Sequence, residues 1–417
     1  MYLLSLYVPK IATMDDVDLK NKKVLVRVDF NSPVDPEKKQ ILDDLRIRAH
    51  SETLKELVDV HNASVVVMAH QGRPGTSDFI SLEPHAKRLS EIMGIDVKFI
   101  DDVIGPAARD AIKSLGNGEI LLLDNVRLMS EENINAKPEK QAKTFFVQRL
   151  YKLFDYFILD AFGTAHRSQP SLVGFPMVLP SVTGRIMERE VKALQRIASG
   201  TVGPKIFVLG GAKVDDSIRI IETLTKNRVV DRILLTGLLS EIFLLAKGVN
   251  LGPENMEVIK NKGLIDLVRD ARAILLKGAP IETPVDFVTL VGDEVTTVPA
   301  TNIKGLIRDI GPETIRIYSE LLKDSELIVM RGPAGVMEDP RFRKGTEELA
   351  KAALQSNAFV IFGGGHLSAV AAGVEHNKEK VHVSTGGGAL LTFLSGEPLP
   401  ALEALSKSCE KFIWKKG

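Results

Sequence analysis

The sequence reads Asp160-Ala-Phe-Gly-Thr-Ala-His-Arg167 near its middle and, after a helical segment, Gly210-Gly-Ala-Lys-Val-Asp-Asp-Ser217. The first stretch ends in two side chains that can carry positive charge, and the second places a lysine behind a pair of glycines. Glycine lets backbone N–H groups come close to a phosphate group, and lysine adds a mobile positive charge. One anion-binding loop therefore closes the first half of the chain and another opens the second half, and we expect the two to act together.

The two halves of the chain share one plan, in which short apolar strands alternate with helices. In the first half, strand-like runs occur at residues 24–28, 64–68, 96–100, 119–124 and 156–160, and helical spacing occurs at 45–60, 82–93 and 138–153. In the second half, strand-like runs occur at 205–209, 232–235, 273–276, 327–330 and 358–362, and helical spacing occurs at 214–226, 253–269, 312–322, 345–355 and 367–373. The stretch 281–301, rich in Val and Thr, is expected to include antiparallel strands. Alternation of this kind indicates mainly parallel sheets with helices on both faces.

We therefore predict an α/β fold of two Rossmann-like three-layer domains with parallel sheets, joined by a helix and a hinge. The predicted first domain is 1–185, the connecting helix is 186–200 and the second domain is 201–399. The helix has an apolar face that includes Val191 and Leu194, which also suits an ordinary core helix. Its place between two complete sets of strands and helices favours the connector.

Composition limits the classes of partner. Lys plus Arg and Asp plus Glu both number 54, so the net charge at pH 7 is zero, and no basic excess indicates nucleic acid or an acidic membrane. The single cysteine, Cys409, cannot form a disulfide within the chain and is expected to be structural or inert. No stretch qualifies as a transmembrane helix or a signal peptide. We expect a cytoplasmic protein.

Cationic side chains follow the strands of the first half. Ligands of open parallel sheets bind at the carboxyl ends of the strands, and the planar fork of arginine suits phosphate and carboxylate. The residues directed to this edge are Arg27, Arg46, His70, Arg73, Arg127, His166 and Arg167. They predict a small, multiply anionic ligand, although each alone could be a scattered surface charge. His61 and His85 lack such a context and are expected to be exposed.

Glycines follow the strands of the second half. Gly363-Gly-Gly365 precedes His366, and Thr385-Gly-Gly-Gly388 precedes a helix. Each triplet alone could be a tight turn, but together with Lys213 they favour nucleotide phosphates at helix N-termini. Glu338 could accept hydrogen bonds from ribose hydroxyls. The P-loop, the G-x-G-x-x-G fingerprint and Cys/His metal spacing are absent from the sequence.

Eight motifs in one order resemble phosphoglycerate kinase over nearly the whole chain. They are Val24-Leu-Val-Arg-Val-Asp-Phe-Asn31, His70-Gln-Gly-Arg-Pro74, Asp160 to Arg167, Gly210-Gly-Ala-Lys-Val214, Pro284-Val-Asp-Phe287, Gly311-Pro-Glu313, Gly332-Pro-Ala-Gly-Val336 with Glu338, and Ser384-Thr-Gly-Gly-Gly-Ala389. One such motif is weak, whereas eight in order are specific.

The resemblance implies a hinge-bending enzyme of two domains, each with a six-stranded parallel sheet. It implies reversible phosphoryl transfer between 1,3-bisphosphoglycerate with ADP and 3-phosphoglycerate with ATP, in glycolysis and gluconeogenesis. The acceptor is a carboxyl group, Mg²⁺ is carried with ATP or ADP, and the ligands are small molecules rather than nucleic acid or membrane. The protein is expected to be a monomer or a homodimer, with residues 400–417 packing back on the first domain.

The resemblance also implies a role for individual residues. The residues implied to bind phosphoglycerate are Asp29, Phe30, Asn31, Arg46, His70, Gln71, Gly72, Arg73, Arg127 and Arg167. Those implied to bind nucleotide are Gly210, Gly211, Ala212, Lys213, Gly311, Glu338, Gly363, Gly364, Gly365, His366, Leu367 and Gly386. Those implied to act in the transfer itself are Arg46, Lys213, Gly365 and Gly387, with Arg46 and Lys213 converging on the transferring group.

Four positions depart from the common family pattern. Ser217 stands where a second lysine is common, and His366 stands where an aspartate helps to hold Mg²⁺. Gln169 stands for a histidine and Arg331 for an asparagine. Sequences with Ser at position 217 and with Gly-Gly-Gly-His at 363–366 resemble the archaeal branch. The metal ligands stay open: Asp216 is one candidate, and phosphate oxygens with water are another.

Two other functions remain open from the sequence. Ser217 and His366 motivate a catalytically silent sensor of nucleotide and phosphosugar. A dinucleotide-dependent dehydrogenase is a weaker alternative because the fingerprint glycines are missing.

Overall fold

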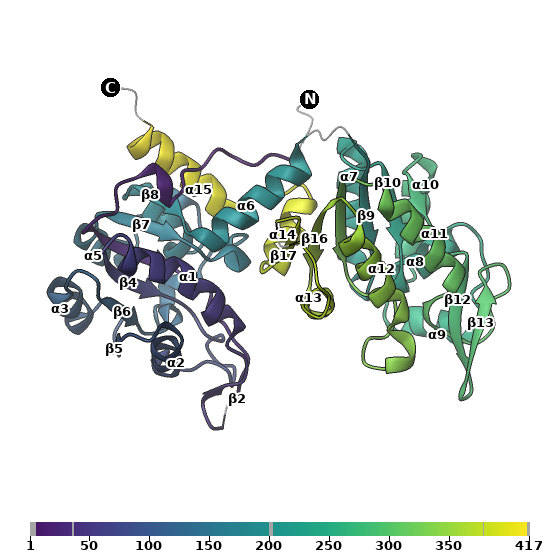
Figure 1. Ribbon diagram of the computed structural model, residues 1–417, viewed down its shortest axis with the longest axis horizontal. Helices are drawn as coiled ribbons and strands as arrows, with labels where there is room; N and C mark the ends of the chain where they lie inside the picture. The colour runs from purple at the N-terminus through teal and green to yellow at the C-terminus, as the bar shows by residue number, and fades with distance from the viewer. Residues whose placement is uncertain (1–5, 36, 200–202, 378, 415–417) are drawn as a thin grey trace. The chain divides into compact units, whose positions relative to one another are not determined.

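The computed structural model describes residues 6–35, 37–199, 203–377 and 379–414. Its contacts divide the chain into two compact units (Figure 1). The N-terminal unit consists of residues 8–192 and the chain from residue 398 onward, and the C-terminal unit consists mainly of residues 193–397. The division falls inside helix α6 (Arg185–Ala198). Gly200, the last residue of the predicted connecting helix, lies outside the described residues, and the predicted bounds of 1–185, 186–200 and 201–399 stay a prediction.

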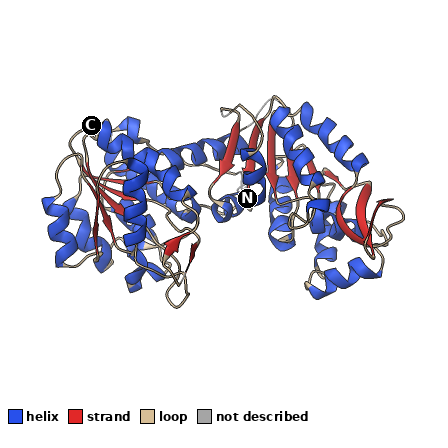
Figure 2. Cartoon of the chain, turned by 60° about the horizontal axis from the view of Figure 1, so that its bottom comes forward, coloured by secondary structure: helices blue, strands red, loops and turns tan. Residues whose placement is uncertain are grey.

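A six-stranded parallel sheet forms the centre of the N-terminal unit. In spatial order its strands are β5 (Val97–Ile100), β6 (Ile120–Leu123), β4 (Ser64–Met68), β1 (Lys23–Arg27), β7 (Tyr156–Leu159) and β8 (Ser181–Thr183). Helices lie on both faces of the sheet (Figure 2). Every residue of β4 is buried, which explains why these strands are continuous apolar runs rather than alternating ones.

Helices and short turns connect the strands of this unit. The helices are α1 (Leu45–Asp59), α2 (Glu83–Met93), α3 (Pro106–Ser114), α4 (Pro138–Gln141) and α5 (Phe145–Leu150). A two-stranded hairpin pairs β2 (Val34–Asp35) with β3 (Gln40–Ile41). Short helical turns follow β6 and β7, at η2 (Val126–Leu128), η3 (Ser130–Asn133), η5 (Phe162–Thr164), η6 (Pro170–Gly174) and η7 (Phe175–Met177).

The C-terminal unit repeats the plan. Its parallel sheet has the order β11 (Ile281–Glu282), β10 (Arg232–Leu235), β9 (Lys205–Leu209), β15 (Leu327–Arg331), β16 (Phe359–Gly363) and β17 (Val381–Ser384). A separate antiparallel sheet joins β13 (Glu294–Pro299), β12 (Asp286–Val291) and β14 (Leu306–Ile310). The helices are α7 (Val214–Asn227), α8 (Gly237–Ala246), α9 (Pro253–Asn261), α10 (Leu267–Leu276), α11 (Pro312–Lys323), α12 (Lys344–Gln355), α13 (Gly365–Ala372) and α14 (Gly387–Leu394). The predicted α/β class with two parallel sheets is confirmed.

Two predictions of secondary structure in this unit were wrong. Residues 273–276, expected as a strand, end helix α10, because a four-residue apolar run does not distinguish a strand from a buried helix turn. The single helix expected at 253–269 is instead two helices, α9 and the start of α10. Gly263, in the left-handed region at φ +68°, lies just after α9, and this conformation does not continue a helix. The antiparallel strands expected within 281–301 are confirmed as β12 and β13.

The end of the chain, as far as residue 414, packs on the N-terminal unit. Helix α15 (Pro400–Ser408) contacts η6, η7 and β8. The Ser408 hydroxyl donates to the carbonyl oxygen of Leu179 (2.8 Å), and the Sγ of Cys409 accepts from the Ala12 N–H (3.2 Å). Burial raises the pKa of the Cys409 thiol, which keeps it protonated and unreactive at neutral pH.

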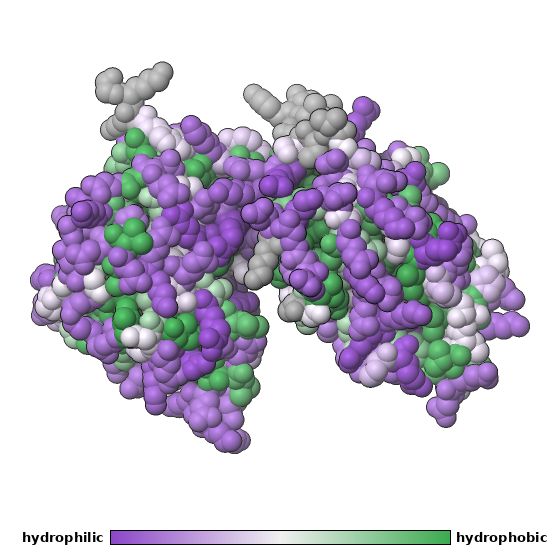
Figure 3. Space-filling view, viewed as in Figure 1, coloured by the Kyte–Doolittle hydropathy of each residue, from purple (hydrophilic) through white to green (hydrophobic). Residues whose placement is uncertain are grey.

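None of the helices within the described residues has the length and apolar character needed to span a membrane. The face of the molecule in Figure 3 is mainly hydrophilic, with apolar residues scattered among polar ones.

Replacing Leu405 with alanine tests whether α15 stabilises the N-terminal unit. Leu405 is completely buried on this helix, so Leu405→Ala is expected to lower the free energy of unfolding by about 2–5 kcal/mol. The fluorescence of Trp414, the only tryptophan of the chain, reports the transition because its ring packs against the core of this unit. Lys407→Ala, on the exposed face of the same helix, serves as the control with an expected change within about 0.5 kcal/mol. An equal effect of the two changes would contradict a packing role for α15.

Candidate active site

The carboxyl end of β1 carries a buried arginine. Arg27 is 1% exposed, and its Nε donates to the Ser171 hydroxyl (2.9 Å) while Nη2 donates to Nδ1 of His70 (3.1 Å). Glu132, also completely buried, accepts from the hydroxyl (2.5 Å) and the N–H (3.0 Å) of Ser171. Because His70 accepts at Nδ1, and because burial and then the Arg27 charge hold its pKa well below the usual value, His70 is neutral.

An ion pair orders the loop that follows β1. Arg46, in the first turn of α1, donates from Nη1 to Oδ2 of Asp29 at 2.5 Å. Burial raises the pKa of Asp29, but the neighbouring cations, Arg46 first among them, outweigh burial and lower it to about 2. Asp29 is therefore ionised at neutral pH and holds the guanidinium of Arg46 in place.

Positive charge around this pair exceeds negative charge. Burial, followed by the charges of Arg167, Arg27 and Arg73, lowers the pKa of Arg127 to about 10. Nη1 of Arg167 is buried and has no hydrogen-bond partner among the described residues. A buried donor without a partner is costly, and like charges repel. A multiply anionic ligand would satisfy the donor and relieve the repulsion.

The loop after β4 is fixed by side chains and a glycine. The Asn31 side-chain oxygen accepts from the Gly72 N–H (2.9 Å), and Arg127 donates from Nη1 to the Gly72 carbonyl oxygen. Gly72 has φ +64°, and a Cβ there would lie 2.4 Å from the Asp78 carbonyl oxygen, so only glycine fits. Gln71 accepts from the Ser32 N–H (2.9 Å) and donates to the Ser32 carbonyl oxygen (3.0 Å), which ties this loop to the one after β1.

The expectation that His85 is exposed was wrong. His85 is completely buried on the inner face of α2, its Nε2 lies 3.2 Å from Oε1 of Gln71, and its ring stacks on Phe30. Burial lowers the pKa of His85 to about 4, so it is neutral at pH 7. His61 is half-buried rather than exposed. Phe30 is completely buried against His50 and His85, so its ring supports the loop and does not face solvent.

The structure brings most of the predicted first-half residues together, through hydrogen bonds or mutual charge effects on pKa. Those so linked are Arg27, Asp29, Asn31, Arg46, His70, Gln71, Gly72, Arg73, Arg127, His166 and Arg167. We call this set the basic cluster. Arg73 and Arg46 are its more exposed members.

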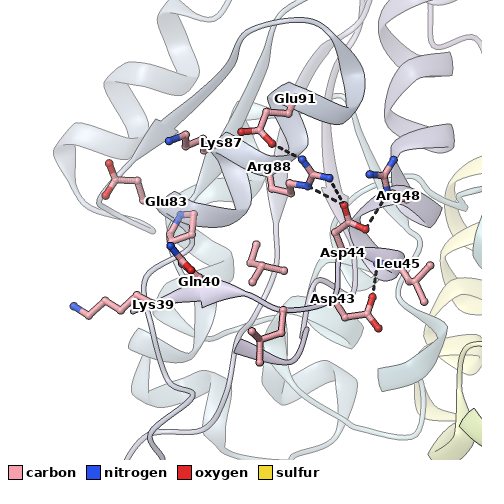
Figure 4. Close-up of a pocket in the computed structure, with 13 residues that line it drawn as sticks. Lys39, Gln40, Asp43, Asp44, Leu45, Arg48, Glu83, Lys87, Arg88 and Glu91 are labelled. Atoms are coloured by element: carbon pink, nitrogen blue, oxygen red, sulfur yellow. Dashed lines mark hydrogen bonds and ion pairs between the residues drawn. The ribbon is translucent and has the colours of Figure 1, made fainter. Parts of the chain in front are cut away.

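A different pocket in this unit is electrically balanced. It has a volume of 940 Å³ and lies where the starts of α1 and α2 face β3 (Figure 4). Four cationic and four acidic side chains line it. Asp44 accepts from Nε of Arg48 (2.9 Å) and Nε of Arg88 (2.8 Å), and Arg88 also pairs with Glu91. Because its cationic and acidic side chains are equal in number, the pocket does not attract an anion as the basic cluster does.

The C-terminal unit contains a pocket of 850 Å³ at the carboxyl ends of its strands. The predicted residues that line it are Gly210, Gly211, Ala212, Lys213, Glu338, Gly363, Gly364, Gly365, His366, Leu367 and Gly387. Gly365 and Gly387 begin α13 and α14, so free backbone N–H groups and the positive ends of two helix dipoles meet the pocket. Such an edge is suited to phosphate.

Two predicted glycines do not line this pocket. Gly386 precedes α14, and Gly311 precedes α11. A Cβ at Gly311 would lie 2.2 Å from the Asp286 carboxylate, which accepts from the Thr314 N–H (2.8 Å) and hydroxyl (2.6 Å). Gly311 is therefore needed for packing at this helix start.

The floor of the pocket is a close crossing of two loops. Gly332 has φ +78°, and a Cβ there would lie 2.2 Å from the Gly210 carbonyl oxygen. The Gly210 N–H donates to the Arg331 carbonyl oxygen (2.8 Å), so the ends of β9 and β15 are locked together. Lys213 follows this crossing immediately before α7, and its side chain is exposed.

The arginine that directly precedes the Gly332 motif also lines the pocket. Arg331 ends β15, with Nη2 3.7 Å from Oδ2 of Asp216 and Nη1 3.4 Å from Oγ of Ser217. Asp216, the candidate metal ligand, therefore faces a guanidinium. No group of three or more His, Cys, Asp or Glu side chains that could hold a metal ion occurs within the part of the chain that the structure describes.

Apolar side chains and one buried carboxyl group also line the pocket, next to the cations Lys262 and Arg308. Leu238, Val258 and Ile307 line it together with Glu241 of α8. Burial raises the pKa of Glu241 to about 8, so the group is mainly protonated at pH 7. Sequence reasoning missed Glu241, because no motif surrounds this residue.

A family model described as phosphoglycerate kinase matches residues 14–397. This chain belongs to the phosphoglycerate kinase family. It is therefore a kinase, and the resemblance seen in the sequence is confirmed.

Phosphoglycerate kinases of archaea are among its relatives. Those of Sulfurisphaera tokodaii and Saccharolobus solfataricus are 57% and 55% identical over 400 and 399 residues, each match covering 95% of this chain and 96% and 97% of the relative. The crystal structure of phosphoglycerate kinase from Pyrococcus horikoshii OT3 is 41% identical with a TM-score of 0.87, and the match covers 96% of this chain and all of that one. The chain thus resembles the archaeal branch of the family.

Exchanging Glu241 for glutamine tests whether the buried carboxyl group of Glu241 is protonated in the folded protein. Between its ordinary pKa of 4.5 and the raised value of about 8, the folded state holds a proton that the unfolded state releases. The free energy of unfolding of the parent chain is therefore expected to fall as the pH rises through this window. In Glu241→Gln the side chain does not titrate, so this contribution to the fall is absent. Unfolding in denaturant measures the free energy of unfolding of both proteins at pH 5 and pH 8. Between these two pH values, the stability of the variant relative to the parent is expected to rise by on the order of a few kcal/mol.

Glu257→Gln, on the exposed face of α9, is the matched control and is expected to show the same stability relative to the parent at both pH values. A pH-independent difference for Glu241→Gln would mean that the carboxyl group is ionised in the folded protein.

Proposed function

We propose that this chain transfers the terminal phosphoryl group of ATP to the carboxylate of 3-phosphoglycerate, and in the reverse direction returns it from 1,3-bisphosphoglycerate to ADP. The acceptor is then a carboxyl group, and the reaction belongs to glycolysis and gluconeogenesis. The observation that carries this proposal is the excess of positive charge in the basic cluster, on a different unit from the glycine-edged pocket. A kinase that joins two anionic substrates needs two such sites.

The basic cluster is proposed to bind phosphoglycerate. Its ligand carries a phosphate and a carboxylate, and both suit the forks of arginine. Arg127 and Arg167 would hold the phosphate, since Arg167 has a buried donor without a partner in the described chain. Asp29 and Asn31 would accept from or orient the ligand's hydroxyl, and Arg46 would lie nearest to the transferring group. His70 would act as a neutral hydrogen-bonding group.

The pocket of the C-terminal unit is proposed to bind the nucleotide. The phosphates would lie against the starts of α13 and α14 near Lys213, and the base would lie among Leu238, Val258 and Ile307. Glu338, which also lines the pocket, would accept from the ribose hydroxyls.

Mg²⁺ is proposed to arrive with the nucleotide. Mg²⁺ in kinases is bound by substrate phosphates, water and only one or two carboxylates. Asp216 and Asp215 at the start of α7 are sufficient for such a mode, although Asp216 shares its charge with Arg331. The metal would supply positive charge to the phosphate oxygens.

Transfer needs in-line attack. A carboxylate oxygen of 3-phosphoglycerate forms a bond to the terminal phosphorus while the bond from that phosphorus to the ADP oxygen breaks, and the electron pair stays on ADP. Arg46 and Lys213 are proposed to stabilise the charge on the equatorial oxygens. Because they belong to different units, both units must contribute to one event, which would also keep water from the acyl phosphate. We place the reaction in the cytoplasm, as the lone, buried Cys409 suits a reducing compartment.

A coupled assay tests the activity. The full chain is incubated with ATP, Mg²⁺ and 3-phosphoglycerate, and a dehydrogenase that reduces the acyl phosphate reports the product through loss of NADH. Turnover that EDTA abolishes is expected. Binding of both ligands without turnover would instead support the silent sensor, which the comparisons do not favour.

Lys213→Ala is expected to lower kcat by a factor of about 10² or more with little change in KM. The reason is that a cation at the transferring group stabilises the transition state more than bound substrate. Steady-state kinetics of the same assay measure it. Lys226→Ala, at the exposed far end of the same helix, is the control with unchanged kinetics. A near-normal kcat for the Lys213 variant would remove this residue from the mechanism.

Arg127→Ala is expected to raise KM for 3-phosphoglycerate by about 10-fold or more, because a charged hydrogen bond to the ligand is lost. KM for ATP is expected to stay within about 2-fold, since the site lies on the other unit. Arg149→Ala, an exposed arginine of α5, is the control. Equal weakening of both substrates would contradict the assignment of Arg127 to phosphoglycerate.

A further inference from the structure

We propose that Arg331, in the space left by Ser217, binds the phosphoryl group that is transferred. This inference deepens the proposed kinase activity and rests on it. In this proposal Arg331, at the end of a strand, supplies the positive charge that a lysine at position 217 of α7 would otherwise supply.

The register of the sheet puts Arg331 in the middle of the strand ends that are proposed to bind phosphate. Arg331 ends β15 and pairs across the parallel ladders with Leu209 of β9 on one side and Gly363 of β16 on the other. The turns that start at Gly210 and Gly363 therefore flank it. Its side chain is 13% exposed and lines the same pocket as Lys213.

The guanidinium is incompletely neutralised. Among the described residues it forms an ion pair only with Asp216, and the distance of 3.7 Å is too long for a strong hydrogen bond. The guanidinium also donates from Nη1 to the uncharged hydroxyl of Ser217, at 3.4 Å. Burial lowers the pKa of Arg331 and the charge of Asp216 offsets part of this, yet arginine keeps its proton at pH 7. A half-buried guanidinium that has five N–H donors and only two weak partners can bind an anion.

The short side chain of Ser217 leaves space for the guanidinium of Arg331. The residue is 1% exposed, and its hydroxyl donates to the Lys213 carbonyl oxygen (3.1 Å) one helical turn earlier. The Ser217 N–H also donates to this carbonyl oxygen (3.3 Å), so position 217 lies directly beside the backbone of Lys213, the N-cap residue of α7. A long side chain here would enter the space that Arg331 now occupies. A lysine at 217 and an arginine at 331 are therefore alternative ways to place one cation there.

The chemistry of the transfer uses such a cation. As the new bond to the carboxylate oxygen forms and the bond to the ADP oxygen breaks, negative charge is spread over three equatorial oxygens. The planar fork of Arg331 can donate to two oxygens at once, and Lys213 adds a point charge. Neither side chain gains or loses a proton in the step.

The test compares three variants in the coupled assay, in both directions. Arg331→Asn is expected to lower kcat by a factor of about 10² or more, with KM for 3-phosphoglycerate within about 3-fold of the parent. Arg331→Asn combined with Ser217→Lys is expected to regain at least about 10-fold in kcat, because it returns a cation to the same space. Arg316→Asn, an exposed arginine of α11 paired with Glu313, is the control with parent kinetics.

Two results would overturn the inference. One is an Arg331→Asn variant with kcat within about 2-fold of the parent. The other is a double variant that folds as the parent does, by thermal unfolding, but is no more active than Arg331→Asn. Should the asparagine variant fail to fold, Arg331→Gln replaces it: a kcat lowered by a factor of about 10² or more supports the role, and a kcat within about 2-fold of the parent overturns it.

The failure of this inference is distinguishable from failure of the proposed function. Absence of turnover in the parent chain refutes the kinase activity itself. Normal turnover of Arg331→Asn, in a parent that is active, refutes only the phosphate contact of Arg331.

Discussion

Parallel strands end at one edge of a sheet, and this constraint gathers the chemistry of the chain. In the N-terminal unit, β1, β4, β6 and β7 each deliver a polar or cationic residue to that edge, so arginines from distant parts of the sequence come close enough to lower one another's pKa. In the C-terminal unit the same edge carries mainly glycines, with Arg331 at the end of β15. One architecture therefore produces a charged site and a backbone-lined site, and the difference lies only in the residues that end the strands.

The basic cluster keeps an excess of positive charge because its carboxylates balance only part of the charge of its arginines. Asp29, with a pKa of about 2, orders Arg46, and the buried Glu132 lies beside Arg27 through Ser171. These two carboxylates cannot neutralise every arginine of the basic cluster. The core of the unit must hold like charges together before a ligand arrives. Such an arrangement stores unfavourable electrostatic energy that an anion releases, which favours tight binding of a multiply charged ligand.

Much of this organisation could be predicted from the sequence. Strands such as Lys205–Leu209 are short apolar runs that precede a glycine or a charge, so both their type and the site residues after them follow from local pattern. Facts that depend on packing did not follow. His85 has no motif, and only the fold shows that its ring lies on Phe30. Residues 273–276 have the same apolar pattern as a strand, and only their neighbours make them helical.

The pair of Arg331 and Ser217 shows why substitutions at a site are best interpreted in three dimensions. Each position, taken alone, departs from the common family pattern, and Ser217 alone indicates a lost cation. The structure places the two side chains 3.4 Å apart, although 114 positions separate them in the chain. A short residue on the helix and a long one at the strand end then conserve charge and volume together. In the proposed role of Arg331, the positive charge comes from a strand end instead of a helix, and the ladders to β9 and β16 hold the backbone of this arginine on both sides.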